Sequence, residues 1–296
     1  MSWFALATYR TAAKLEAGVV IDNKLYDARQ ALPGGLDAAF SDWPRAQATV
    51  RQLGEQARAG KLAAAVEGIG AVTAPVRPTR IFCAAANYIE HANEMGTVLA
   101  AKAQSKPYMF LKLQDTVVGP GDDVIMPPET QKLDWEVELG VVIGRQGRRI
   151  GVGEALDYVA GYTVVNDISA RDLNSRSDYP FKFDWFQGKC WDTFAPLGPW
   201  IVPAWLVPDP QALHMRLLVN GKQMQEDITG HMIWNVREQI SYLSQILTLR
   251  PGDVIATGTP TGVGMARGIF LKDGDSVEAI IDGIGTLKNR IVAEKR

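Results

Sequence analysis

The segment KLDWEVELGVVIG, at residues 132–144, constrains the fold more than any other stretch of this chain. Asp134, Glu136 and Glu138 alternate with apolar residues, and strand side chains alternate between faces, so all three carboxylates are expected on one face. Beyond Glu138 both faces become apolar, which is typical of a strand buried on both sides. Like charges in such surroundings repel and lose hydration, so they either take up protons or hold a cation.

A third carboxylate follows another apolar run. In GYTVVNDISARDL, Asp167 stands at the end of the run, where it could join Glu136 and Glu138 in an all-oxygen set with positions open for water and substrate. Oxygen ligands favour magnesium, manganese or calcium over zinc, which more often recruits Cys or His. Two simpler interpretations stay open, in which the strand acids face water and Asp167 only caps the next turn.

Composition excludes several classes of protein. The 296 residues, 47% hydrophobic and 22% charged, are typical of a globular chain with one large domain and a small companion. Lys and Arg (31) nearly balance Asp and Glu (33), so no nucleic-acid partner is expected. We also expect no membrane partner and a cytoplasmic location, because membrane-helix and signal-peptide patterns are missing. Cys83 and Cys190 are too few for a disulfide framework or a structural zinc site.

Turn and helix signals divide the chain in two. Residues 1–72 are predicted to form a small N-terminal α+β domain, with a hairpin turn in GVVIDNKLYDA followed by an Ala-rich helix. Residues 73–296 contain short strands, an Asn-Gly hairpin turn in RLLVNGKQMQ, and one well-spaced amphipathic helix in WNVREQISYLSQILTL. The larger domain is therefore predicted to be a β-rich α+β fold.

The stretch NYIEHANEMG predicts a short helix that is capped by Asn87 and ends at Gly96. His91 and Glu94 are three residues apart and hence neighbours on one helix face. A carboxylate beside an imidazole fixes its tautomer and raises its basicity, which prepares a general base. The alternative is an ion pair on the helix surface.

Two later segments could belong to the same site. Lys189 lies in the Gly- and aromatic-rich stretch FQGKCWDTFAPLGPW, where it could bind a carboxylate or stabilise an enolate; plain solvent exposure is the alternative. The segment RPGDVIATGTPTGVG turns sharply twice and is expected to present Thr257, Thr259 and backbone amides, as an anion-binding loop does. Cys190 has no nearby His and is expected to be a packing residue.

Five motifs, taken in order, resemble those of the fumarylacetoacetate hydrolase family: NYIEHANE, DWEVELGVVIG, NDISARDL, GKCWDTFAPLGPW and GDVIATGTPTGVG. The resemblance covers residues 80–296 and implies a mixed β-roll domain, a homodimer and a divalent metal, most commonly magnesium, with manganese or calcium possible. It implies the following residue roles: metal ligands Glu136, Glu138 and Asp167; catalytic residues His91, Glu94 and Lys189; substrate-binding residues Arg171 and Thr259.

The sequence departs from the family pattern at a few positions. Ala85 replaces a common glycine, and Asn174 replaces a common glutamine with a shorter amide. Asp134 matches a position that is often acidic but less consistently a ligand, so it is left outside the ligand set. The aromatic and charged segment within residues 172–188 is predicted to be a lid over the substrate.

The resemblance implies hydrolysis of a carbon–carbon bond in a β-diketo acid of the acylpyruvate or fumarylpyruvate type. The metal would chelate the 2-oxo-acid end, His91 would activate water, and Lys189 would stabilise the departing pyruvate enolate. Decarboxylation, isomerisation or hydration of a 2-oxo acid would use the same residues and stays an alternative. A non-catalytic protein with a structural cation is a third possibility, but it has no use for the His91–Glu94 pair together with Lys189.

Overall fold

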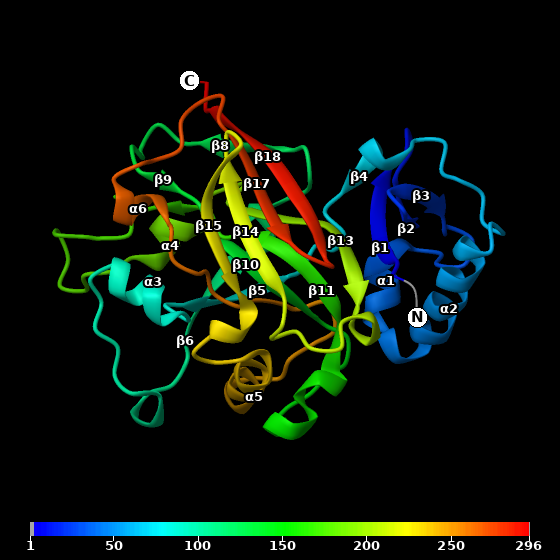
Figure 1. Cartoon of the computed structure of the whole chain (residues 1–296), viewed down its shortest axis with the longest axis horizontal. Coiled ribbons are helices and arrows are strands. Elements are labelled where there is room, and N and C mark those ends of the chain that lie inside the picture. The colour runs from blue at the N-terminus through cyan, green and yellow to red at the C-terminus, as the bar shows by residue number, and fades with distance from the viewer. Residues whose placement is uncertain (1–2, 296) are drawn as a thin grey trace.

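The computed structural model describes residues 3–295, which form a β-rich α+β fold and confirm the predicted fold class (Figure 1). The helices are α1 (Gly35–Ser41), α2 (Trp43–Arg58), α3 (Ile89–Glu94), α4 (Trp185–Lys189), α5 (Val236–Ile246) and α6 (Gly264–Arg267). The first strands are β1 (Ala5–Arg10), β2 (Leu15–Ile21), β3 (Lys24–Asp27), β4 (Val72–Thr73), β5 (Arg80–Ala85), β6 (Tyr108–Leu113), β7 (Val117–Val118), β8 (Asp123–Met126) and β9 (Leu133–Asp134). The remaining strands are β10 (Val137–Ile143), β11 (Val159–Asn166), β12 (Ser169–Ala170), β13 (Ala195–Pro203), β14 (His214–Val219), β15 (Lys222–Ile228), β16 (Val254–Ala256), β17 (Ser276–Ile281) and β18 (Gly285–Ala293).

The strands form three sheets. The largest has the order β3-β2-β1-β13-β11-β10-β16-β5-β6, with β4 beside β1 and β7 beside β13. A second sheet has the order β15-β14-β17-β18-β8, and β12 pairs with β9 alone. Antiparallel and parallel pairs both occur, since β5 runs parallel to β16 and β8 parallel to β18, so the sheets are mixed.

The N-terminal strands extend the large sheet. Figure 1 shows the N-terminal segments, in blue, at one end of the molecule beside β13. There β1 pairs antiparallel with β13, with Leu6 opposite Ile201. Helices α1 and α2 cover this end, where Trp43 stacks on Trp205 at a centroid distance of 5.8 Å. The boundary near residue 72 stays a prediction.

Strand β10 lies in the middle of the large sheet, between β11 and β16. All its residues are buried, as the doubly apolar pattern predicts. The alternating segment is nevertheless not one continuous strand. It is interrupted at Trp135 and Glu136, and Asp134 belongs to β9, which pairs with β12 rather than β11.

The predicted local signals have mixed outcomes. Asp22 and Asn23 adopt positive φ (49° and 58°) in the β2–β3 hairpin, and Asn220-Gly221 joins β14 to β15, so both turn predictions are confirmed. The Asn87 cap is wrong: the side chain of Tyr88, the residue before α3, makes no cap, and Asn87 Nδ2 instead donates to the carbonyls of Trp234 and Thr257. A long-range bond thus outcompetes the local one.

Candidate active site

The three predicted metal ligands meet at the end of the β10–β11 ladder. Val137 pairs with Asn166, and just beyond this pair the Asp167 N–H donates to the Glu136 carbonyl at 2.8 Å. Glu138 lies two residues further along and points to the same side. One oxygen from each of Glu136, Glu138 and Asp167 lies within 4.8 Å of the others, and all three residues are buried. Antiparallel pairing therefore brings Asp167 beside acids thirty residues earlier.

Two buried lysines contact these acids. Lys189 Nζ lies 2.7 Å from Glu136 Oε2 and 2.8 Å from Asp167 Oδ2, so it is not solvent-exposed. Lys112 Nζ lies 2.5 Å from Asp167 Oδ1, donates to the carbonyls of Ile168 and Phe194, and is equally buried. The two ammonium groups balance part of the negative charge of the cluster.

The three carboxyl groups do not share this compensation equally. Burial favours protonation of Glu136, but Lys189 and Arg171 outweigh it and hold the pKa of Glu136 well below its usual range. Burial raises the pKa of Glu138 well above its usual value, and the negative charges of Asp167 and Glu136 raise it further. Without a further positive charge nearby, Glu138 therefore favours its protonated form.

The cluster fits a divalent cation. Its donors are all carboxylate oxygens, which suit a hard ion such as magnesium, manganese or calcium. Asp167 Oδ1 is buried and accepts no hydrogen bond, although Lys112 lies close to it. The raised pKa of Glu138 is the other sign, because its buried carboxyl group ionises readily only when a further positive charge lies beside it.

The His91–Glu94 pair lies on α3 and is largely enclosed. His91 is 7% exposed, and its Nδ1 lies 2.9 Å from Glu94 Oε1, so the two form no surface ion pair. Thr261 Oγ1 and Gly262 N, both 2.8 Å away, donate to Glu94 Oε2. Burial alone would raise the pKa of Glu94, but hydrogen bonds from His91, Gly262 and Thr261 lower it below its usual value. An ionised Glu94 then holds the imidazole with Nε2 as its free nitrogen.

The loop between β16 and α6 binds anions, but they are carboxylates of the chain itself. Gly258 N donates to Glu138 Oε2 at 2.8 Å, Gly262 N to Glu94, and Gly264 N to Asp134. Gly258 has a φ of +96°, and a Cβ there would lie 2.6 Å from the Asn87 Cβ, so this position requires glycine. The predicted anion-binding loop thus organises the acids of the site.

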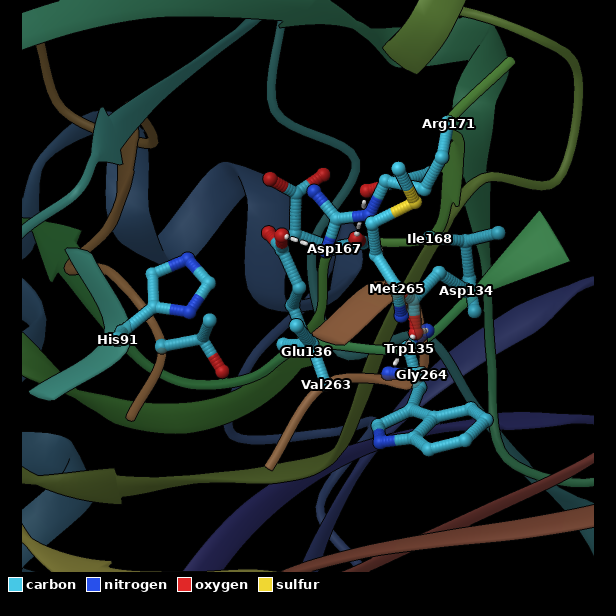
Figure 2. A network of polar contacts seen from close by, with 12 residues as sticks. His91, Asp134, Trp135, Glu136, Asp167, Ile168, Arg171, Val263, Gly264 and Met265 are labelled. Atoms are coloured by element: carbon cyan, nitrogen blue, oxygen red, sulfur yellow. Dashed lines mark hydrogen bonds and ion pairs between the residues drawn. The ribbon is translucent and has the colours of Figure 1, made fainter. Parts of the chain in front are cut away.

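Both predicted substrate-binding residues are near the acids, but their polar groups are occupied. Arg171 Nη2 donates to Glu136 Oε1 at 2.6 Å and its Nε to Asp134 Oδ2 at 2.8 Å (Figure 2). Thr259 Oγ1 donates to the Val137 carbonyl at 2.9 Å and accepts from Gln225 Nε2. Their roles toward a substrate stay predictions.

Most of the proposed site residues, but neither Glu94 nor Asp167, line one cavity of about 650 Å³. Its walls come from several separate segments of the chain, and the helices α3, α4 and α6, which contribute to them, lie on one side of the molecule (Figure 1). The acids Glu136 and Glu138, together with His91, Lys189 and Arg171, contribute to its lining. The outer wall is largely apolar and includes Tyr108, Phe110, Trp185 and Trp234.

The predicted lid segment contributes to this wall. Arg176 pairs with Asp178 at 2.6 Å and with Asp184 at 3.2 Å, and Asp184 caps α4 by accepting from Gln187 N. Phe181 and Phe183 are 72% and 63% exposed, which leaves apolar side chains uncovered above the cavity. Movement of this segment stays a prediction.

Sequence reasoning missed one residue of the cluster, Lys112, and the actual partners of Asn87. Lys112 was overlooked because a lysine between two leucines suggests an outward-facing charge; on the edge strand β6 the leucines face outward, at 49% and 46% exposure, and the lysine faces inward. Asn87 was expected to cap α3.

No helix within residues 3–295 has the length and apolar character needed to cross a membrane.

Known proteins share both the sequence and the fold. The model of the fumarylacetoacetate (FAA) hydrolase C-terminal family matches residues 80–292. The mitochondrial oxaloacetate tautomerase Fahd2a of Rattus norvegicus is 41% identical over 222 residues, which are 74% of this chain and 68% of the relative.

Two solved structures extend the likeness to nearly the whole chain. The maleylpyruvate hydrolase of Sphingobium sp. SYK-6, in complex with manganese(II) and pyruvate, has a TM-score of 0.77 at 28% identity and covers 98% of this chain and 100% of its own. The 5-carboxymethyl-2-hydroxymuconate delta-isomerase of Mycobacterium smegmatis has a TM-score of 0.74 at 28% identity and covers 99% of this chain and 100% of its own. The chain therefore belongs to the fumarylacetoacetate hydrolase family.

Proposed function

We propose that this protein is a divalent-metal-dependent enzyme that interconverts the enol and keto forms of a 2-oxo acid of the oxaloacetate type. The observation that carries the proposal is the His91–Glu94 pair, 2.9 Å apart, whose His91 lines the same cavity as Glu136 and Glu138 of the carboxylate cluster. The relative named oxaloacetate tautomerase supports this substrate class. A small-molecule substrate suits a cavity of this volume whose lining is mostly apolar with a few charged groups.

The metal site would use Glu136, Glu138 and Asp167. A bound magnesium or manganese ion would act as a Lewis acid toward the carboxylate and 2-oxo oxygens of the substrate, which acidifies the neighbouring C3–H. The manganese and pyruvate named with the maleylpyruvate hydrolase structure support this assignment. Magnesium is the ion we propose, with manganese or calcium as substitutes.

The residues of the chain would handle the proton and the charge. His91 Nε2, with Nδ1 held by Glu94, would take a proton from C3 of the keto form while the 2-oxo oxygen gains one; in the reverse direction the enol hydroxyl loses its proton and His91 returns one to C3. Lys189, fixed against Glu136 and Asp167, adds positive charge beside the developing enolate. Arg171 and Thr259 would orient the substrate, and the aromatic outer wall would exclude water.

A second candidate is hydrolysis of the carbon–carbon bond in an acylpyruvate or fumarylpyruvate. The cavity of about 650 Å³ favours it, because that volume leaves room for an acyl group beyond a 2-oxo-acid end. In this reaction His91 would take a proton from water, and Lys189 would stabilise the pyruvate enolate that departs. Decarboxylation or hydration of a 2-oxo acid could use the same residues.

One experiment separates these reactions. The protein, with Mg²⁺ or Mn²⁺, is mixed with enol-oxaloacetate, acetylpyruvate or fumarylpyruvate, and enol absorbance, pyruvate and carbon dioxide are measured. We expect fast loss of the enol and little pyruvate from the diketo acids. Pyruvate release without tautomerisation would favour the hydrolase, and carbon dioxide release from oxaloacetate would favour a decarboxylase.

Variants at His91 and Glu136 test for catalysis itself. His91→Ala and Glu136→Ala should both remain folded and lose turnover, whereas a purely structural cation site predicts that only Glu136→Ala matters and that it unfolds the protein. A homodimer and a cytoplasmic location are further proposals; the rat relative is named as mitochondrial. Sedimentation and cell fractionation test them.

A further inference from the structure

Asp134 is a fully buried carboxylate that receives four hydrogen bonds. Its Oδ1 accepts from the backbone N–H groups of Trp135, at 2.8 Å, and Gly264, at 2.7 Å. Its Oδ2 accepts from Met265 N at 2.9 Å and from Arg171 Nε at 2.8 Å. All four hydrogen-bond partners are donors, so this position suits a carboxylate, which offers acceptors at both oxygens, better than an amide of the same size.

On one side, Asp134 fixes a predicted metal ligand through Arg171. The guanidinium donates Nε to Asp134 and Nη2 to Glu136 Oε1, which lies 2.6 Å away (Figure 2). The Arg171 side chain is only 7% exposed, so it has little freedom to adopt another orientation. Glu136 therefore keeps its second oxygen toward Lys189 and the other acids.

On the other side, Asp134 holds residues 261–265, which are the end of the loop before α6 and the first two residues of that helix, together called the 261–265 loop below. One end of this loop, at Thr261 and Gly262, donates to Glu94, and the other end, at Gly264 and Met265, donates to Asp134. The backbone is also held beyond Asp134, because Ile269 N donates to the Gly264 carbonyl at 3.0 Å; the packing there is close, since a Cβ on Gly264 would lie 2.1 Å from the Ile269 carbonyl oxygen. A displacement at Asp134 is thus transmitted to the Glu94 carboxylate.

We propose that Asp134 is a positioning residue that sets the spacing between the metal cluster and the His91–Glu94 pair. Figure 2 shows Glu136 between Asp134 on one side and His91 on the other. Asp134 touches neither the cavity nor the substrate, and it acts through Arg171 and the 261–265 loop. The inference depends on the proposed metal site, but not on which 2-oxo acid is the substrate.

The test variant is Asp134→Asn, which keeps size and shape. In either orientation its amide directs N–H groups at two existing donors, which displaces Arg171 or the loop. The matched control is Asp253→Asn: Asp253 is also a buried aspartate, paired with both Nε and Nη2 of Arg80, but it is not part of the cluster. Mn²⁺ affinity is measured by calorimetry without substrate, and kcat and KM are measured separately.

The expected result is specific to positioning. Asp134→Asn should weaken Mn²⁺ binding and lower kcat about ten- to a hundred-fold, the usual effect of losing a group that orients a metal ligand. Asp253→Asn should lower the melting temperature and leave the Mn²⁺ affinity and kcat within about twofold of wild type. Arg171→Lys keeps the positive charge but cannot bond to Asp134 and Glu136 at once, so it should reproduce the loss of Mn²⁺ affinity. The double variant should have the same Mn²⁺ affinity as the single variant that binds Mn²⁺ more weakly.

Three results would overturn the inference. Wild-type Mn²⁺ affinity and kcat in Asp134→Asn would overturn it while leaving the proposed function intact. Additive losses of affinity in the Asp134 and Arg171 variants would show that the two residues act separately. No Mn²⁺ binding by the wild type would overturn the proposed function and this inference together.

Discussion

Replacing Lys112 with Met tests how the acids of the cluster are held together. The ammonium group is buried, lies 2.5 Å from Asp167 Oδ1 and donates to two carbonyls, so its loss leaves a buried carboxylate without this partner. Removing one partner of a buried pair costs about 3–5 kcal/mol. The methionine fills the volume of the lysine stem, so packing adds little to this cost.

The expected melting temperature follows from this value. For a chain of this size about 2 °C is lost per kcal/mol, so Lys112→Met in chelator should melt about 6–10 °C below wild type. A metal ion bound by Asp167 replaces the lost positive charge, so saturating Mn²⁺ should stabilise the variant more than it stabilises wild type.

Calorimetric melting with chelator and with Mn²⁺ measures both quantities. Lys288→Met is the control, because it removes an exposed lysine that is 2.9 Å from Glu278, and its melting temperature should change by less than about 2 °C. A Lys112→Met variant that melts within 2 °C of wild type in chelator, or an Mn²⁺ shift no larger than that of wild type, would refute the reasoning.

Three further predictions concern the acids. Glu94→Gln should lower kcat about a hundredfold with unchanged Mn²⁺ affinity, as steady-state kinetics and calorimetry would show; equal kcat would contradict the general-base role. Because the pKa of Glu138 is raised, Mn²⁺ binding should release a proton and strengthen as the pH rises, which calorimetry in two buffers of different ionisation enthalpy detects. The folded state binds this proton more tightly than the unfolded state, so Glu138 stabilises the fold fully at a pH below its ordinary pKa of 4.5. This stabilisation is lost as the pH rises through the raised pKa of the folded state. At alkaline pH, metal-free Glu138→Gln should therefore have a higher melting temperature than wild type. A lower melting temperature would contradict the raised pKa of Glu138.

Much of the site could be predicted because it follows from strand geometry. Alternation predicts that Glu136 and Glu138 share one side, and an apolar run ending in an acid predicts the position of Asp167. The His91–Glu94 contact follows from helical spacing alone. These relations are local, so the sequence carries them directly.

The unpredicted part depends on tertiary contacts. Asp134 appeared to continue the alternating strand, but β9 pairs with β12, so its partners are Arg171 and a loop 130 residues away. Lys112 faces inward only because β6 is an edge strand with its leucines outward. The Asn87 side chain bonds to Trp234 and Thr257, which are 147 and 170 positions further along the chain, rather than to its own helix. Pairing between distant segments decides each of these positions.

The pairing of β1 with β13 joins the N-terminal residues to the segment that the family model matches. The family model begins at residue 80, yet β13 forms ladder contacts with β1 on one side and β11 on the other. A fragment that starts at residue 80 would leave that edge of β13 without its partner and would uncover Trp205, which now stacks on Trp43. Sequence variation within the first 72 residues can therefore alter the solubility and lifetime of the enzyme without touching a residue of its cavity.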